Sequence, residues 1–242
     1  MQGRGRGARV LRKARFGFEP GARELAMASL AEWIGQAARE ARRRRPSLEW
    51  VLGASEVRYL LLPWTPDLAD PRFRDVLAAA SFEQQFREDP GLFAARFAGP
   101  VYGHAQLAAF VPHALVAEIG AHASASGCRL ARIEPAVAVV WARFQPLLRQ
   151  ERGTLLLIDG ERQLVLRHAH GQIAQVALRP FCTGTLAASL PAGDGDAAWR
   201  VFSSNPVETG CANSEAALRL ADGHGFVAVE DAGYAFALCG VY

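Results

Sequence analysis

Lysine is almost absent from this sequence, and so are the motifs by which catalytic and nucleotide-binding chains are most often recognised. Lys13 is the only lysine among the 27 basic residues. The chain contains no G-x-x-x-x-G-K-[ST] or G-x-G-x-x-G phosphate loop, no G-x-S-x-G nucleophile elbow and no H-E-x-x-H zinc helix. Without any of these signatures, we expect a protein that is not an enzyme and that has no resident cofactor.

Paired cysteines and long apolar runs are missing as well. The four cysteines (Cys128, Cys182, Cys211 and Cys239) are scattered without a C-x-x-C pair, which argues against a zinc ribbon and favours reduced thiols. No apolar run reaches the about 18 residues of a membrane span, and no apolar stretch of a signal peptide follows the basic N-terminus. We therefore expect a cytoplasmic, soluble protein without a metal site.

The net charge of +3 conceals an uneven distribution. Residues 1–45 hold 12 basic and 4 acidic residues, and the rest of the chain holds 15 and 20. The run Arg42-Arg43-Arg44-Arg45 follows a helical pattern, where cations suit the negative end of the helix dipole. These arginines are a candidate basic patch for nucleic acid, anionic lipid or an acidic partner, and a solvated helix end is the alternative. The lack of interleaved aromatic residues argues against nucleic acid.

The order of predicted elements restarts once along the chain. Residues 1–12 are rich in Gly and Arg and predict a disordered basic tail. Strands and helices alternate to about residue 149, and a fresh meander of strands then begins at 154–159, 162–168 and 172–179. This restart predicts an α/β fold with two mixed α/β subdomains, at 13–150 and 151–242.

The remaining elements are expected from periodicity and from turn residues. Residues 70–86 predict a helix, opened by Asp70-Pro71, whose buried side is Phe73, Val76, Leu77, Ala80, Phe82 and Phe86. Pro146 is expected to end or kink a helix over 136–149. The other expected elements are a strand at 14–21 with 24–29 as its hairpin partner, a helix from Ser29, a hairpin over 48–64, strands at 92–97, 105–111, 128–135, 199–203, 226–230 and 234–240, and helices at 112–122, 183–190 and 213–221.

Asp159-Gly160 allows two interpretations. Asp-Gly between apolar runs is a strong hairpin signal, yet strand–Asp-Gly–strand is also typical of actin-type phosphate loops. Such a loop aims backbone N–H groups at an anion, and the carboxylate of Glu161 at the loop tip would repel phosphate. We favour the hairpin and keep the phosphate loop as the alternative.

Residues 16–21, Phe-Gly-Phe-Glu-Pro-Gly, raise the same question in the first half of the chain. A strand followed by Gly17 and Gly21 is a candidate first phosphate loop. Glu19 stands where an aspartate would hold hydrated magnesium, and Pro20 removes an N–H donor. We therefore interpret Gly17, Gly21, Asp159 and Gly160 as a vestigial nucleotide site, with ATP and magnesium as the alternative ligands.

His168 and His170 are spaced to lie on one face of a strand. A pair at this spacing can ligate a metal, but no nearby Cys, Asp or Glu completes a ligand set. We expect both side chains on a solvated face near a turn.

Three stretches in the middle of the chain carry a family resemblance. They are VLGASEVRYLLLPWTPDL (51–68), AAASFEQQFREDPGLF (78–93) and QLAAFVPHALVAEIGAHASASGCRLARIEPAVAVVW (106–141). Their order resembles that of the actin-like cytoplasmic proteins of GspL and PilM type, from type II secretion and type IV pilus assembly. The resemblance covers roughly residues 48–180. It implies an actin-like fold of two RNase H-like subdomains.

The resemblance also implies a function. Such proteins are scaffolds that dock onto the cytoplasmic tail of an inner-membrane assembly protein and onto the secretion or pilus ATPase. PilM-like members bind ATP, whereas GspL-like members have largely lost the phosphate loops, and Glu19, Pro20, Glu161 and Arg162 place this chain with the latter. A GspL-like protein would continue beyond Tyr242 into a membrane span, so we expect either a chain of PilM size or a shortened one.

Three functional hypotheses follow. The first is a non-catalytic scaffold, peripheral at the inner membrane through its partners, with a homodimer as a further option. The second is a nucleotide-binding actin-like ATPase. The third is an arginine-mediated binder of nucleic acid or membrane surface.

Overall fold

The computed structural model describes residues 13–14, 23–40, 46–149, 152–181, 198–205, 215–223, 226–228 and 230–239. The predicted tail at 1–12, most of the predicted strand at 14–21 and the predicted helix at 183–190 lie outside these residues. Within the described part of the chain, no helix is long and apolar enough to cross a membrane.

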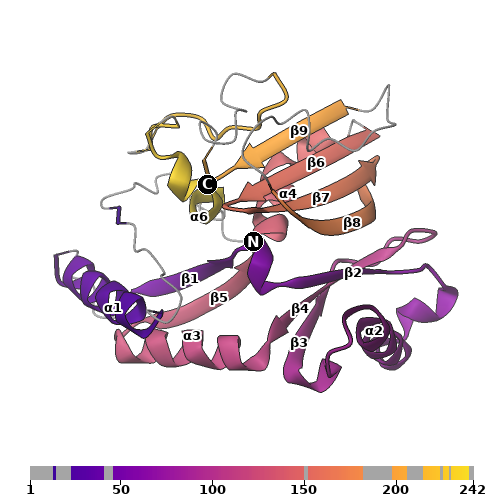
Figure 1. Ribbon diagram of the computed structural model, residues 1–242, viewed down its shortest axis with the longest axis horizontal. Helices are drawn as coiled ribbons and strands as arrows, with labels where there is room; N and C mark the ends of the chain where they lie inside the picture. The colour runs from indigo at the N-terminus through magenta and orange to yellow at the C-terminus, as the bar shows by residue number, and fades with distance from the viewer. Residues whose placement is uncertain are drawn as a thin grey trace.

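The second half of the chain builds a four-stranded sheet, drawn at the top of Figure 1. Three strands run antiparallel to their neighbours, and a fourth returns parallel to the first, in the order β8-β7-β6-β9. The strands predicted at 154–159, 162–168, 172–179 and 199–203 are confirmed. Their bounds are β6 (Arg152–Asp159), β7 (Arg162–Ala169), β8 (Gln172–Pro180) and β9 (Ala198–Ser203).

Two tight turns join the first three strands. Asp159 pairs with Arg162, so Gly160 and Glu161 are the two loop residues. Gly160 has a φ of 56°, whereas the φ of Glu161 is not positive. This pattern fits a type II′ turn, which places glycine first. At the next turn His170 (φ 51°) and Gly171 (φ 76°) are both left-handed, as a type I′ turn requires. Asp159-Gly160 thus forms the tight hairpin turn that the sequence predicts.

The first half of the chain builds two smaller sheets. A parallel pair joins β1 (Ser47–Leu52) to β5 (Arg129–Pro135). An antiparallel sheet has the order β2-β4-β3. Its strands are β2 (Arg58–Leu62), β3 (Phe93–Phe97) and β4 (Gln106–Pro112).

The predicted hairpin over 48–64 is wrong. Both of its strands exist, but β1 pairs with β5 and β2 pairs with β4. A 3-10 turn over Ala54–Glu56 separates them and sends β2 into the other sheet. An ion pair between Arg132 and Glu49 also joins β1 to its distant partner.

Helices cover these sheets. The prediction of a strand at 24–29 is wrong, because α1 is already helical from Arg23. Pro146 neither ends nor breaks α4, since it lies in the last turn, where little helix remains to be interrupted. The helix α3 ends in a Schellman motif, with left-handed Gly127 (φ 66°) and a hydrogen bond from Cys128 N to Ala123 O. The bounds are α1 (Arg23–Glu40), α3 (His113–Ala125) and α4 (Ala136–Leu148).

The helix α2 (Pro71–Phe86) begins where the Asp70-Pro71 signal predicts, with the Asp70 carboxylate accepting from Arg72 N. Its predicted buried side is partly wrong. Phe82 is fully buried, but Phe73 is 39% and Val76 70% exposed, and Ala80 is exposed as well. The helix carries apolar residues on two faces, and the sheet covers the face that contains Phe82.

The end of the chain differs from its prediction. The sequence predicts a strand at 234–240, but Tyr234 closes a 3-10 turn and α6 spans Ala235–Cys239. Residues 215–221 form turns and irregular chain instead of the predicted helix, and Phe226 makes one isolated bridge instead of a strand. Short apolar runs of this kind fit helix and strand equally well, so periodicity does not decide between them.

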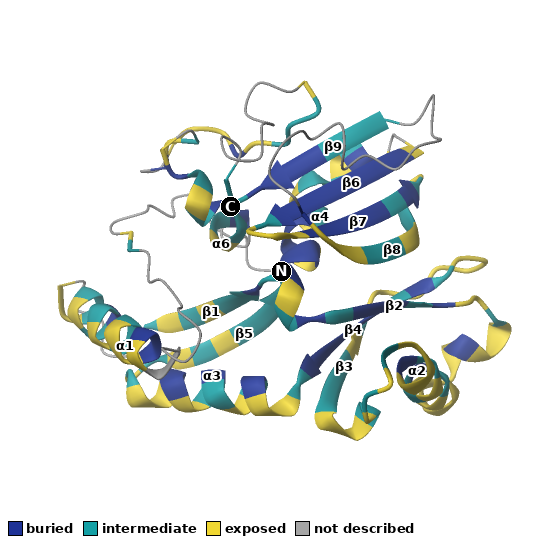
Figure 2. Ribbon diagram, in the orientation of Figure 1, coloured by how far each residue is buried: buried dark blue, intermediate teal, exposed yellow. Residues whose placement is uncertain are grey.

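One large core joins the two halves of the chain. It includes Leu52 of β1, Val140 and Leu148 of α4, Leu157 of β6 and Phe202 of β9. Helix α4 contributes Val137, Val139 and Val140 to this core, and β6 and β7 are buried along most of their length (Figure 2). A second cluster packs α2 onto the three-stranded sheet around Phe82.

Candidate functional site

Asp159 ends β6 with its carboxylate against the first half of the chain. A Cβ added to Gly53 would lie 2.6 Å from Asp159 Oδ2, so the carboxylate touches the backbone at Gly53. The carboxylate accepts a hydrogen bond from the Ala54 backbone N–H and one of 3.4 Å from Ser204 Oγ. Asp159 therefore caps the 3-10 turn that begins at Ala54 and ties it to the second half of the chain.

Burial raises the pKa of the Asp159 carboxyl above its ordinary value, and the hydrogen bonds from Ser204 and Ala54 oppose that rise. The group is thus partly removed from water and already bonded within the protein. An anion approaching this turn would meet the Asp159 carboxylate, which repels it when ionised.

The structure does not describe the other predicted site residues. Gly17, Gly21 and Arg42–Arg45 lie outside the described residues. The interpretation of Asp159 and Gly160 as remnants of a nucleotide site therefore stays a prediction.

The described part of the chain contains a cavity of about 540 Å³ at the junction of the two halves, called here the junction groove. Its walls come from the end of β3, the loop 98–105 and β4 on one side, from α4 on the second, and from the β7–β8 turn on the third. Its lining is largely apolar, with Phe97, Val101, Val137, Trp141 and Ile173 among the larger side chains.

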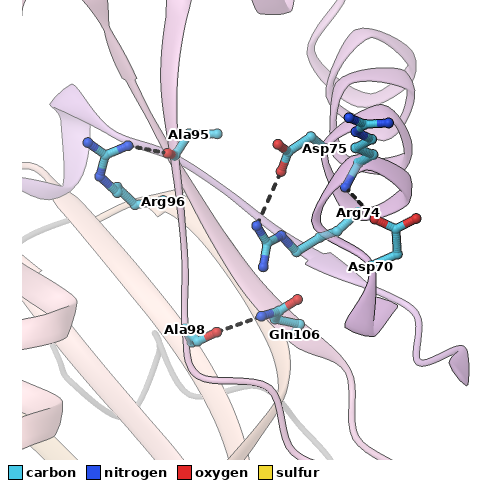
Figure 3. A network of polar contacts seen from close by, with 8 residues as sticks. Asp70, Arg74, Asp75, Ala95, Arg96, Ala98 and Gln106 are labelled. Carbon is cyan, nitrogen blue, oxygen red and sulfur yellow. Dashed lines mark hydrogen bonds and ion pairs between the residues drawn. The ribbon is translucent and has the colours of Figure 1, made fainter. Parts of the chain in front are cut away.

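The outer wall of the junction groove is the loop 98–105, and several contacts hold it. The buried Gln106 donates from Nε2 to Ala98 O at 2.6 Å, and Figure 3 shows its amide directed at that carbonyl. Ala98 N donates to Leu107 O at 2.9 Å. Tyr102 packs edge-on against Trp64 with ring centroids 5.0 Å apart. The loop thus presents a shaped wall, with Tyr102 itself 87% exposed.

Arg149, just after α4, forms part of the opposite wall. Its Cγ lies so close to Gly171 that a Cβ there would approach to 2.6 Å, so the aliphatic stem rests on the turn. With its amide oxygen turned toward Arg149, Gln145 accepts from Arg149 Nε at 3.2 Å and from Nη2 at 2.8 Å. These contacts hold the guanidinium in one place before any ligand arrives.

His168 corrects the expectation of a solvated histidine pair. It is 3% exposed and packs edge-on against Trp141, with ring centroids 5.5 Å apart, whereas His170 is exposed at the turn. His168 therefore supports the Trp141 wall of the junction groove. No group of three or more possible metal ligands occurs in the described ranges.

Sequence reasoning did not find the junction groove. Its lining comes from residues 96–109, 135–149 and 171–173, which form no local motif. The dipeptide His170-Gly171 between two apolar runs is a local signal for a turn, but it does not show what packs on that turn.

Comparisons with known proteins identify the fold. No family model and no curated protein sequence matches the chain. Among solved structures, the chain is similar to the cytoplasmic domain of EpsL, an inner membrane component of the type II secretion system of Vibrio cholerae. The TM-score is 0.50 at 16% identity, over 74% of this chain and 66% of that one.

The chain is also similar to a PilM–PilN type IV pilus biogenesis complex, with a TM-score of 0.50 at 17% identity. That match covers 64% of this chain and 48% of the other. The fold is therefore the actin-like fold of GspL-type and PilM-type proteins, and the predicted fold class is confirmed.

Proposed function

We propose that this chain is a non-catalytic cytoplasmic scaffold of a type IV pilus or type II secretion-like envelope machine. It binds the cytoplasmic tail of an inner-membrane assembly protein, docks onto the assembly ATPase, and stays at the inner membrane through these partners. The observation that carries the proposal is the junction groove, which offers an apolar, preformed channel between the two halves of the fold.

Two further observations support the proposal. The similar structures are a component of the type II secretion system and a PilM–PilN complex. The Asp159 carboxylate is used in contacts with Ala54 and Ser204, which favours a scaffold over a nucleotide-dependent ATPase.

The direct test is co-purification with the cytoplasmic tail of an inner-membrane pilus or secretion assembly protein from the same organism, fused to a carrier. Ala138 is exposed on α4 and lines the groove, so A138W places a large side chain in the groove and leaves its arginines unsubstituted. Ala80 is exposed on α2 outside the groove, and A80W is the matched control. We expect the tail to bind the wild type and A80W and to be lost with A138W. Failure of the tail to bind the wild-type chain would count against the scaffold.

A second measurement separates the scaffold from the ATPase. Calorimetry with ATP and magnesium should give no binding heat at micromolar protein concentration. Clear micromolar binding that D159A removes would favour the nucleotide-dependent alternative.

A further inference from the structure

The charged residues of the junction groove have one sign. Arg96 and Arg149 line it, and no Asp or Glu is among the residues that do. No carboxylate of the described part of the chain forms an ion pair with either arginine. The groove therefore combines apolar walls with two cations that have no partner of opposite charge in the described chain.

The two arginines differ in how firmly they are held. Arg96 is exposed, and its Nη1 donates to the neighbouring Ala95 O at 2.9 Å (Figure 3). Arg149 rests on Gly171 and is bonded twice by Gln145. A guanidinium held in this way loses little side-chain entropy when it binds a carboxylate.

We propose that the junction groove selects an extended acidic segment of a partner protein, with apolar side chains against Trp141 and Phe97 and a carboxylate on Arg149. This inference rests on the proposed function, because it names the chemistry of the partner that the groove receives. Apolar anchors supply the affinity, and the carboxylate sets which segment is accepted and in which register.

The observations favour a peptide over the other anionic partners. Nucleic acid and anionic lipid are bound by rows of cations, and each neutralised phosphate adds to the salt dependence. The junction groove offers two cations and a concave apolar wall. An extended peptide fits this arrangement, and its affinity should fall only shallowly with salt.

The test is a selection from a phage-displayed library of random peptides, each about a dozen residues long, on the wild-type chain and on three variants. R149E reverses the charge of the held arginine, A138W fills the groove, and R72E reverses an exposed arginine on α2 outside the groove. We expect the wild type and R72E to enrich peptides that carry Asp or Glu beside apolar residues. We expect R149E to enrich Lys or Arg at that position, and A138W to enrich neither class.

Synthetic peptides with sequences from the wild-type selection then measure how much Arg149 contributes to binding affinity. R149Q should weaken binding of the acidic peptide about two- to fivefold, the range for an exposed charge pair, and should not weaken binding of its Glu→Gln version. Vesicles of phosphatidylcholine with about one third phosphatidylglycerol test for lipid binding. If the wild type binds them and R149E does not, the proposal is overturned in favour of an anionic lipid.

The outcomes separate this inference from the proposed function. The selection could enrich apolar peptides that show no preference for Asp or Glu and that A138W no longer binds. That result would overturn the proposal of an acidic partner but would leave binding in the groove intact. Acidic peptides that bind equally to wild type and R149E would overturn the role of Arg149. A selection without enriched peptides, alongside successful co-purification of the membrane tail, would overturn the inference and leave the scaffold standing.

Discussion

The carboxylate of Asp159 touches the backbone of Gly53, so that a residue in the second half of the chain occupies the space in which a side chain at position 53 would lie. A Cβ at Gly53 would be 2.6 Å from Asp159 Oδ2, a separation that requires one group to move. This contact uses the turn that sequence reasoning assigned to a former phosphate loop. It indicates that the turn now joins the two halves of the fold.

G53A should therefore lower the free energy of unfolding by about 1–3 kcal/mol, the cost of overpacking a close contact. G120A is the control, because a Cβ at this helical position meets nothing within 4 Å. Urea unfolding of both variants measures the effect. If Asp159 causes the clash, D159A should recover much of the loss in the G53A background; an additive double variant would contradict this explanation.

D159N should flatten the pH dependence of stability. The pKa of Asp159 is raised in the folded state, so its contribution is largest below the ordinary value of 3.8 and is lost as pH rises through the folded pKa. Asparagine keeps an acceptor for Ala54 N–H and removes the half-buried charge. At neutral pH we expect D159N to unfold at the same or a higher urea concentration than the wild type. A clearly lower midpoint would mean that the ionised carboxylate is needed for stability.

Phe82 and Phe73 on α2 provide a test of which helix face is packed. Phe82 contacts Phe86, Phe93 and Phe110 with ring centroids 4.9, 4.8 and 4.4 Å apart, whereas Phe73 is 39% exposed. F82A should cost about 3–5 kcal/mol of unfolding free energy. F73A should cost less than about 1 kcal/mol. Equal losses would show that the packed face is assigned wrongly.

Lys13 ties the beginning of the described chain to its end through an ion pair of 2.6 Å with the buried Asp231. The hydrogen bond from Lys13, followed by that from Val227 N, lowers the pKa of Asp231. K13Q should lower the thermal midpoint at neutral pH by about 2–4 °C, the effect of roughly 1 kcal/mol in a chain of this size. Because this stabilisation is lost as pH falls through the folded pKa of Asp231, the difference should disappear in acid. R72Q, at an exposed position, should not change the midpoint.

The correct sequence predictions concern structure that is decided locally. The meander from β6 to β8 follows from apolar runs of the right length and from two glycine-containing turns, so neighbouring residues determine it. The start of α2 follows from Asp70 and Pro71 in the same way.

The errors concern partners that lie far along the chain. Nothing near residues 48–64 shows that β1 pairs with β5, roughly 80 residues later, and not with β2. Phe73 and Phe82 are equally apolar in the sequence, and only the position of the three-stranded sheet decides which one is buried. The junction groove and the contact between Asp159 and Gly53 depend on how the two halves pack, which no local pattern encodes.

Hydrogen exchange of the chain with and without the membrane partner's cytoplasmic tail tests the central claim most directly. We expect slower exchange in the loop 98–105, in β4 and at the β7–β8 turn, with no change on adding ATP and magnesium. A138W should abolish this protection, and A80W should not. Protection by ATP around Asp159 and Ser204, or binding of the tail without any protection at the junction groove, would contradict the account.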